Sequence, residues 1–212
     1  MLSPAQLVYA AIGQGINHFT PIQLASYVTA IANGGTRYRL HLVSEVTSPT
    51  GQVLEKTQPQ ILDKIPMSKS TIDTIHEGMR LVDSGPYGTA LTAFGHFPIP
   101  TAGKTGTADV SADQRSYGRA PYATYIGFAP YKDPQVAVMV VMYDGDMAQM
   151  VAKAAYEAYF KNELLKMHYS SPGFTKYVLD APPDNYPGSQ AANEAAAKEK
   201  QQAEANKKVG IS

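Results

Sequence analysis

An unbroken apolar stretch at residues 136–142, VAVMVVM, sets the narrowest limits on the fold of this chain. It indicates a strand buried on both faces, because a strand with one solvent-exposed face would alternate apolar and polar side chains. The preceding residues 122–129 predict a second strand, and the Lys-Asp-Pro sequence at 132–134 predicts a turn between the two. A third short strand is expected at 101–108. Together these segments form a compact β pattern.

The clearest helix signal begins at Thr20, whose side chain can cap the first free backbone amides of a helix. Pro21 is tolerated at the first helical position, because that N–H would have no partner anyway, and Gln23 completes a capping box. The helix is expected to end at residues 33–35, Asn-Gly-Gly, since glycine can adopt a positive φ there.

The remaining pattern predicts a hairpin, two more helices and two loops. The hairpin covers residues 36–57 and turns at 48–51, Ser-Pro-Thr-Gly. The helices are expected at 69–83, capped by Ser68 or Ser70, and at 146–165, and the loops at 85–103 and 109–121. The second of these helices is expected to bury Met147, Val151, Ala154, Ala155 and Ala158.

Composition excludes several classes of function. Eighteen basic residues balance eighteen acidic ones, so the charge gives no reason to expect nucleic acid or an anionic membrane as a partner. The absence of cysteine excludes disulfides and cysteine-based zinc sites. The five histidines lack ligand spacing, and we predict no metal and no cofactor. The chain contains no apolar run of ~18 residues and no basic-then-apolar start, so we expect neither a membrane span nor a signal peptide.

The sharpest local feature is the sequence TAGKTGTA at residues 101–108. On a strand, Lys104 and Gly106 would point to one face, and Thr105 and Thr107 to the other. A ligand could lie close to the backbone at Gly106, because no side chain blocks it there.

Two chemistries use such a sequence. A phosphate-binding loop, G-x-x-x-x-G-K-[ST], would need a glycine at position 98, where this chain has Pro98. The alternative is the third motif of serine acyltransferases, which combine S-x-x-K and S-x-N with K-T-G. The surrounding residues favour the second chemistry.

The chain resembles the penicillin-binding proteins in several segments that occur in the family's order. These segments are residues 13–15 (GQG), 20–25 (TPIQLA), 32–35 (ANGG), 88–90 (GTA), 104–106 (KTG) and 125–130 (YIGFAP). The resemblance covers about residues 9–162. It is strongest to the C-terminal half of the transpeptidase domain of the monofunctional, class B type.

The resemblance implies an α+β fold of the penicillin-binding and serine β-lactamase type, with antiparallel strands and packed helices. In this family the K-T-G strand is a sheet edge along the cleft. The D-Ala-D-Ala end of a peptidoglycan stem peptide, or a β-lactam, lies antiparallel to it. By the same resemblance Lys104 is catalytic, Thr105, Gly106 and Thr107 bind the substrate, and the Thr107 N–H donates to the oxyanion.

The family mechanism uses a serine that is activated by a lysine three residues later. No serine in this chain has lysine at i+3 or asparagine at i+2. We therefore expect that the chain forms no acyl-enzyme alone and needs the N-terminal half of the domain, whose strands would cover the edge at 136–142. The alternatives are a fragment of a β-lactamase or D-Ala carboxypeptidase, or a non-catalytic sensor or scaffold.

Residues beyond about 168 change in character. They are rich in proline and then in alanine, glutamate, lysine and glutamine, and they lack the apolar surface that ordering requires. We therefore predict a transpeptidase part at 1–168 and a low-complexity, disordered tail at 169–212. The resemblance places the parent protein at the extracytoplasmic face of a bacterial membrane.

Overall fold

A computed structural model describes residues 3–110, 112–143 and 145–175. The chain divides into two compact units, Met1–Tyr169 and Ser170–Ser212. In the described part of the second unit, Ser171 caps the short helix α8 (Pro172–Phe174) by accepting from the Phe174 N–H at 3.0 Å. The rest of the predicted tail lies outside the described residues.

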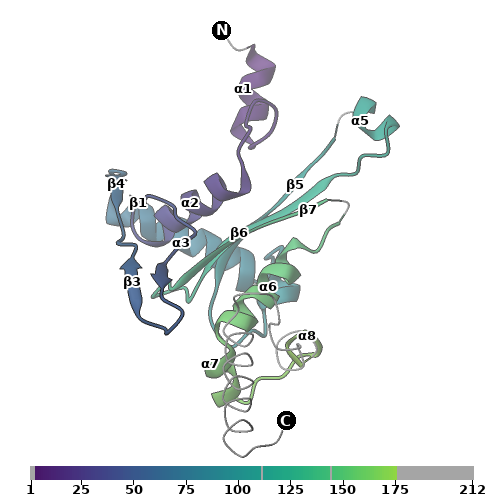
Figure 1. The fold of residues 1–212 in the computed structure, drawn as a ribbon. Helices are drawn as coiled ribbons and strands as arrows, with labels where there is room; N and C mark the ends of the chain where they lie inside the picture. The colour runs from purple at the N-terminus through teal and green to yellow at the C-terminus, as the bar shows by residue number, and fades with distance from the viewer. Residues whose placement is uncertain (1–2, 111, 144, 176–212) are drawn as a thin grey trace, which may run out of the picture. The chain divides into compact units, whose positions relative to one another are not determined.

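The first unit is built on an antiparallel sheet with the order β5-β6-β7, comprising β5 (Ala102–Ala108), β6 (Tyr122–Ala129) and β7 (Val136–Tyr143) (Figure 1). The three predicted strands are confirmed. The expected burial of 136–142 on both faces is wrong, since no residue of β7 is fully buried. The reason is its position, because β7 is an edge of this sheet in the described chain and has a strand neighbour on one side only.

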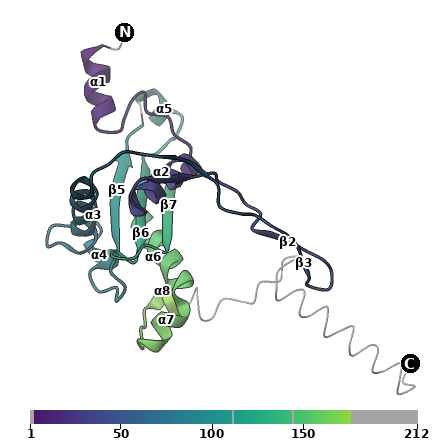
Figure 2. The ribbon, with the colours of Figure 1, turned by 90° about the vertical axis from the view of Figure 1, so that its left-hand side faces the viewer.

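Two helices pack against one face of this sheet, α2 (Pro21–Ala32) and α3 (Lys69–Ser84). The predicted capping box of α2 is present: the Thr20 N–H donates to Gln23 Oε1 at 2.9 Å and the Gln23 N–H donates to Thr20 Oγ1 at 3.3 Å. Figure 2 shows α2 crossing the strands and α3 beside β5. The buried core of this layer comprises Val28, Ile31, Ala32, Met79, Ala102 and Phe128.

The opposite face of the sheet carries α4 (Leu91–Phe94) and α6 (Ala148–Tyr159), which is followed by α7 (Lys161–Lys166). Tyr125 of β6 lies between them, with ring centroids 5.4 Å from Phe94, which is itself 5.9 Å from Tyr156. The prediction of one helix over 146–165 is wrong. The helix is interrupted at Phe160, which separates α6 from α7.

The predicted buried face of α6 is also wrong. Met147 and Val151 are 46% and 48% exposed, whereas Ala148, Ala152 and Tyr156 are buried against the sheet. Small side chains at the first two buried positions let the helix backbone approach β6 and β7 closely. This approach favours an alanine face over one of larger side chains.

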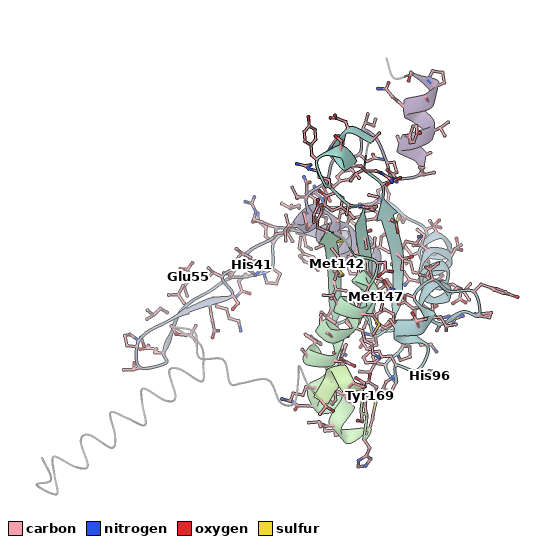
Figure 3. All side chains as sticks on the ribbon, turned by 90° about the vertical axis from the view of Figure 1, so that its right-hand side faces the viewer. His41, Glu55, His96, Met142, Met147 and Tyr169 are labelled. Atoms are coloured by element: carbon pink, nitrogen blue, oxygen red, sulfur yellow. The ribbon has the colours of Figure 1, made fainter. Side chains whose placement is uncertain are left out.

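A two-stranded ribbon projects from the first unit (Figure 2). Its tip is the predicted hairpin, β2 (Glu45–Thr47) with β3 (Val53–Lys56), and its base pairs β1 (Thr36–Tyr38) with β4 (Ile61–Lys64). The base was not predicted. Figure 3 shows His41 and Glu55 on this ribbon, well away from His96. Among the described residues no three histidine or acidic side chains are grouped as metal ligands would be.

Two further helices complete the described chain, α1 (Pro4–Ala11) and α5 (Ala112–Ser116). The second lies in the predicted loop between β5 and β6, and α4 lies in the loop predicted at 85–103, so both loops hold a short helix. None of the described helices combines the length and apolar content needed to cross a bilayer.

Candidate active site

The strand β5 forms the other edge of the sheet. Lys104 is paired with Ile126, and Thr107 with Ala123, on its β6 side. In the described chain no strand pairs with its outer side. An open edge of this kind can receive an extended peptide, whose backbone would continue the ladder. A lysine within a paired strand also contradicts the phosphate-loop alternative, which would place Lys104 where a loop enters a helix.

Lys104 lies exposed on this edge. Its Nζ donates to the carbonyl oxygen of Thr105 at 2.6 Å. It takes part in none of the four ion pairs of the described residues. The ammonium group therefore has donors and charge available for an anionic ligand.

The two threonines of the motif differ in their surroundings. Thr107 is exposed, whereas Thr105 is half-buried and its Oγ1 lies 2.6 Å from the Oγ1 of Thr89, in the loop after α3. The sequence places these two residues far apart, and only the chain path after α3 brings Thr89 to the site strand.

Gly106 is required by its neighbour on β6. A Cβ atom on Gly106 would lie 2.4 Å from Oγ1 of Thr124, well inside van der Waals contact. The predicted reason for this glycine was space for a ligand. The structure adds a second reason, because the Thr124 hydroxyl occupies the space that a side chain would need.

A cavity of 1270 Å³ lies against β5 and is lined by residues 104–108 of the motif strand together with α2 and β1. Its lining in the described chain includes Arg37, Arg39 and Lys104 but no acidic side chain. Arg37 is partly neutralised by Asp63, 2.5 Å away. The remaining positive charge favours an anionic group in the cavity, and sequence reasoning missed both arginines.

The segment at 13–15 also reaches the site. Gln14 Nε2 donates to the carbonyl oxygen of Thr107 at 3.4 Å, on the strand that would pair with a bound peptide. The structure therefore brings Gln14 to the same edge as Lys104, Thr105, Gly106 and Thr107. The chemical roles of these four motif residues remain predictions.

Beneath the strand lies a buried carboxyl group, that of Asp83 at the end of α3. Its Oδ2 accepts hydrogen bonds from Thr101 Oγ1 at 2.7 Å and from the Tyr125 hydroxyl at 2.8 Å. Burial raises its pKa to about 6, although both hydrogen bonds act in the opposite direction. Burial raises the pKa of Tyr156 as well, and the negative charge of Asp83 raises it further.

This carboxyl group predicts how stability depends on pH. The folded pKa of Asp83, about 6, is above its ordinary value of 3.8, so its contribution is fully present below pH 3.8 and is lost as pH rises through 6. The difference corresponds to about 3 kcal/mol of unfolding free energy. Urea unfolding from pH 4 to 8 should show this loss relative to Asp83→Asn, whose neutral amide removes it. Parallel curves for the two proteins would contradict the assignment.

Comparison with known families decides where the chain belongs. A family model described as "Penicillin binding protein transpeptidase domain" matches residues 4–164. The chain belongs to the penicillin-binding protein transpeptidase family. Within that family, Penicillin-binding protein H of Bacillus subtilis is 36% identical over 171 residues, which are 74% of this chain and 23% of that protein. The peptidoglycan D,D-transpeptidase PbpA of Mycolicibacterium smegmatis is 32% identical over 68% of this chain and 28% of that protein.

Solved penicillin-binding proteins have the same fold. Penicillin-binding protein 2B of Streptococcus pneumoniae strain R6 matches 76% of this chain and 28% of its own, with a TM-score of 0.66 and 29% identity. Penicillin-binding protein A of M. tuberculosis, solved as an imipenem acyl-enzyme complex, matches 74% of this chain and 34% of its own, with a TM-score of 0.63 and 27% identity. The predicted family and fold class are confirmed. The chain spans about a quarter of the curated relatives it matches.

Proposed function

We propose that this chain supplies the substrate-holding edge of a D,D-transpeptidase that cross-links peptidoglycan stem peptides. The observation that carries the proposal is the open edge of β5, where Lys104 to Thr107 line a cavity with basic and no acidic side chains in the described chain. The D-Ala-D-Ala end of a stem peptide is extended and ends in a carboxylate, which matches both the edge and its charge.

The attacking group in this proposal comes from polypeptide outside these 212 residues, since the chain has no S-x-x-K sequence. The serine oxygen attacks the carbonyl carbon of the penultimate D-Ala, and its proton passes to the lysine three residues later. The C–N bond to the terminal D-Ala breaks, and that residue leaves with a proton as a free amine. An amine of a second stem peptide then attacks the acyl carbon, the C–O ester bond to the serine breaks, and the amine proton passes through the lysine back to the serine oxygen.

Each motif residue has a part in this reaction. The hydroxyl groups of Thr105 and Thr107 hold the peptide carboxylate, Gly106 keeps its backbone open to the peptide, and Lys104 adds positive charge near the reacting centre. The Thr107 N–H donates to the oxyanion of the tetrahedral intermediate. We place the reaction outside the cytoplasmic membrane, where stem peptides are cross-linked, and propose that the transpeptidase part ends near residue 168, close to the end of the first compact unit at Tyr169.

Fluorescent penicillin tests the proposal. The chain alone should remain unlabelled. A mixture with a polypeptide that carries the family's S-x-x-K and S-x-N motifs should become labelled on the added serine. Labelling of the chain alone, or an unlabelled mixture, would contradict the proposal. Rapid loss of label to water would favour a β-lactamase or carboxypeptidase instead, and an unlabelled mixture would favour a sensor or scaffold.

The contact between Thr89 and Thr105 gives a further prediction. Each hydroxyl has one hydrogen to donate, so if Thr89 donates to Thr105, the Thr105 hydrogen is free for the substrate carboxylate. Thr89→Val should lower the second-order rate constant of penicillin labelling in the mixture by about tenfold. This factor corresponds to the net free energy of about one hydrogen bond. Thr89→Ser keeps the hydroxyl and should behave like the unchanged chain. Equal rates for the valine and serine variants would contradict this orientation.

A further inference from the structure

One carboxylate oxygen beneath the site holds three segments together. Asp83 belongs to α3, Thr101 immediately precedes β5, and Tyr125 lies in the middle of β6, opposite Thr105. Both hydroxyl groups donate to the same Oδ2 atom, at 2.7 and 2.8 Å. All three residues are at most 4% exposed, so water does not compete for these bonds.

The phenol of Tyr125 lies across the two strands next to the motif. A Cβ atom on Gly103 would be 2.1 Å from the Tyr125 hydroxyl oxygen, and one on Gly127 would be 2.6 Å from it. Gly103 and Gly127 are register partners on β5 and β6. The Tyr125 side chain therefore lies over Gly103, the residue before Lys104, and its hydroxyl group bonds to Asp83 from there.

We propose that Asp83 is a positioning residue for the site, which sets the place of Lys104 to Thr107 by holding Thr101 and Tyr125. This inference rests on the proposed function, because it assigns the strand a substrate to be positioned for. The backbone ladder fixes the register of β5 on β6, and apolar packing of Met79 against Ala102 and Phe128 holds the strand pair on α3. Apolar packing is not directional, so it sets the position of the strands less tightly than hydrogen bonds do. The two bonds to Asp83 add directional contacts from α3 to the residue before β5 and to the middle of β6.

Ionisation of Asp83 should shift the backbone of β5. The titratable groups that face it are Tyr125 from β6 and Tyr156 from α6, and α4 contributes none. Among the described residues no basic side chain is a cause of its altered pKa. Ionisation therefore places an uncompensated charge in this layer and strengthens both hydrogen bonds to Oδ2. A change in these bonds shifts Thr101, and with it the backbone of residues 103–107.

The first test needs no catalysis. In a nitrogen-15-labelled sample of the full chain, the backbone amide resonances of residues 103–107 should move together between pH 4.5 and 8, with a midpoint near 6. Asp83→Asn should remove this transition. Tyr131→Phe, which deletes a hydroxyl that donates to the half-buried Glu77 of α3 and not to Asp83, should keep it. The proposal is wrong if these resonances do not titrate together between pH 4.5 and 8, or if the same transition persists in Asp83→Asn.

The second test links position to reaction. In the mixture that labels with penicillin, Thr101→Val removes one anchor without changing size and should lower the second-order labelling constant about tenfold, whereas Thr101→Ser should restore it. Equal constants for the two variants would overturn the proposal. If the unchanged mixture does not label at all, the proposed function fails, while the amide titration still decides whether Asp83 positions the strand.

Discussion

Replacing Lys104 by methionine is expected to slow penicillin labelling of the complemented chain by about 10²–10³-fold, the usual loss when one preorganised polar group is removed from a reacting centre. Methionine keeps the length of the side chain but removes the ammonium group. Lys104 is exposed, and among the described residues its Nζ donates only to the carbonyl oxygen of Thr105, so the stability of the fold should change by less than about 0.5 kcal/mol. Labelling rates at several penicillin concentrations measure the effect.

Two comparisons make this result specific. Lys132→Met, in the turn between β6 and β7, removes the same charge away from the site and should label at the unchanged rate. Lys104→Arg keeps the charge but replaces a compact ammonium with a planar fork, and should recover only part of the rate. If Lys104→Met labels as fast as Lys132→Met, the assignment of Lys104 to the site is wrong.

Replacing Gly103 by alanine is expected to destabilise the fold by about 3 kcal/mol, because the new methyl group would overpack the core. The Tyr125 hydroxyl lies 2.1 Å from the position that this methyl would take. The phenol cannot move aside easily, since it is fully buried and donates to Asp83. Urea denaturation followed by circular dichroism gives the change in unfolding free energy.

A second glycine provides the matched control. Gly78 lies on the exposed surface of α3, and a Cβ atom there would have nothing within 4 Å. Gly78→Ala should therefore stabilise the chain by up to about 1 kcal/mol, through the higher helix propensity of alanine. A Gly103→Ala variant as stable as the unchanged chain would show that the Tyr125 phenol can move aside. It would also weaken the proposed positioning role of Asp83.

Local sequence signals predicted those elements that depend on neighbouring residues. The capping box at Thr20 and Gln23 uses groups three residues apart, and it begins α2 where expected. The strand β6 has the predicted limits because glycine, proline and polar residues bound it on both sides. The K-T-G sequence was placed on a strand for the same local reason.

Local sequence signals did not predict which strands pair when they lie far apart in the chain. The base of the ribbon pairs Thr36–Tyr38 with Ile61–Lys64, and no residue pattern in either short segment predicts this pairing. The buried face of α6 was also assigned wrongly. The apolar residues of α6 and its flanks lie on more than one side of the helix, and only packing against the sheet selects Ala148, Ala152 and Tyr156.

The sequence by itself determined the family, the place of the motif on a strand and the lack of a serine nucleophile with its lysine, because each is written in residues close together along the chain. The tertiary structure decided what surrounds that strand: the Thr89 hydroxyl on Thr105, the arginines of the cavity, and the hydrogen bonds from Thr101 and Tyr125 to Asp83. These contacts join residues that are distant in sequence. They exist only once the sheet and helices have packed, which no local pattern specifies.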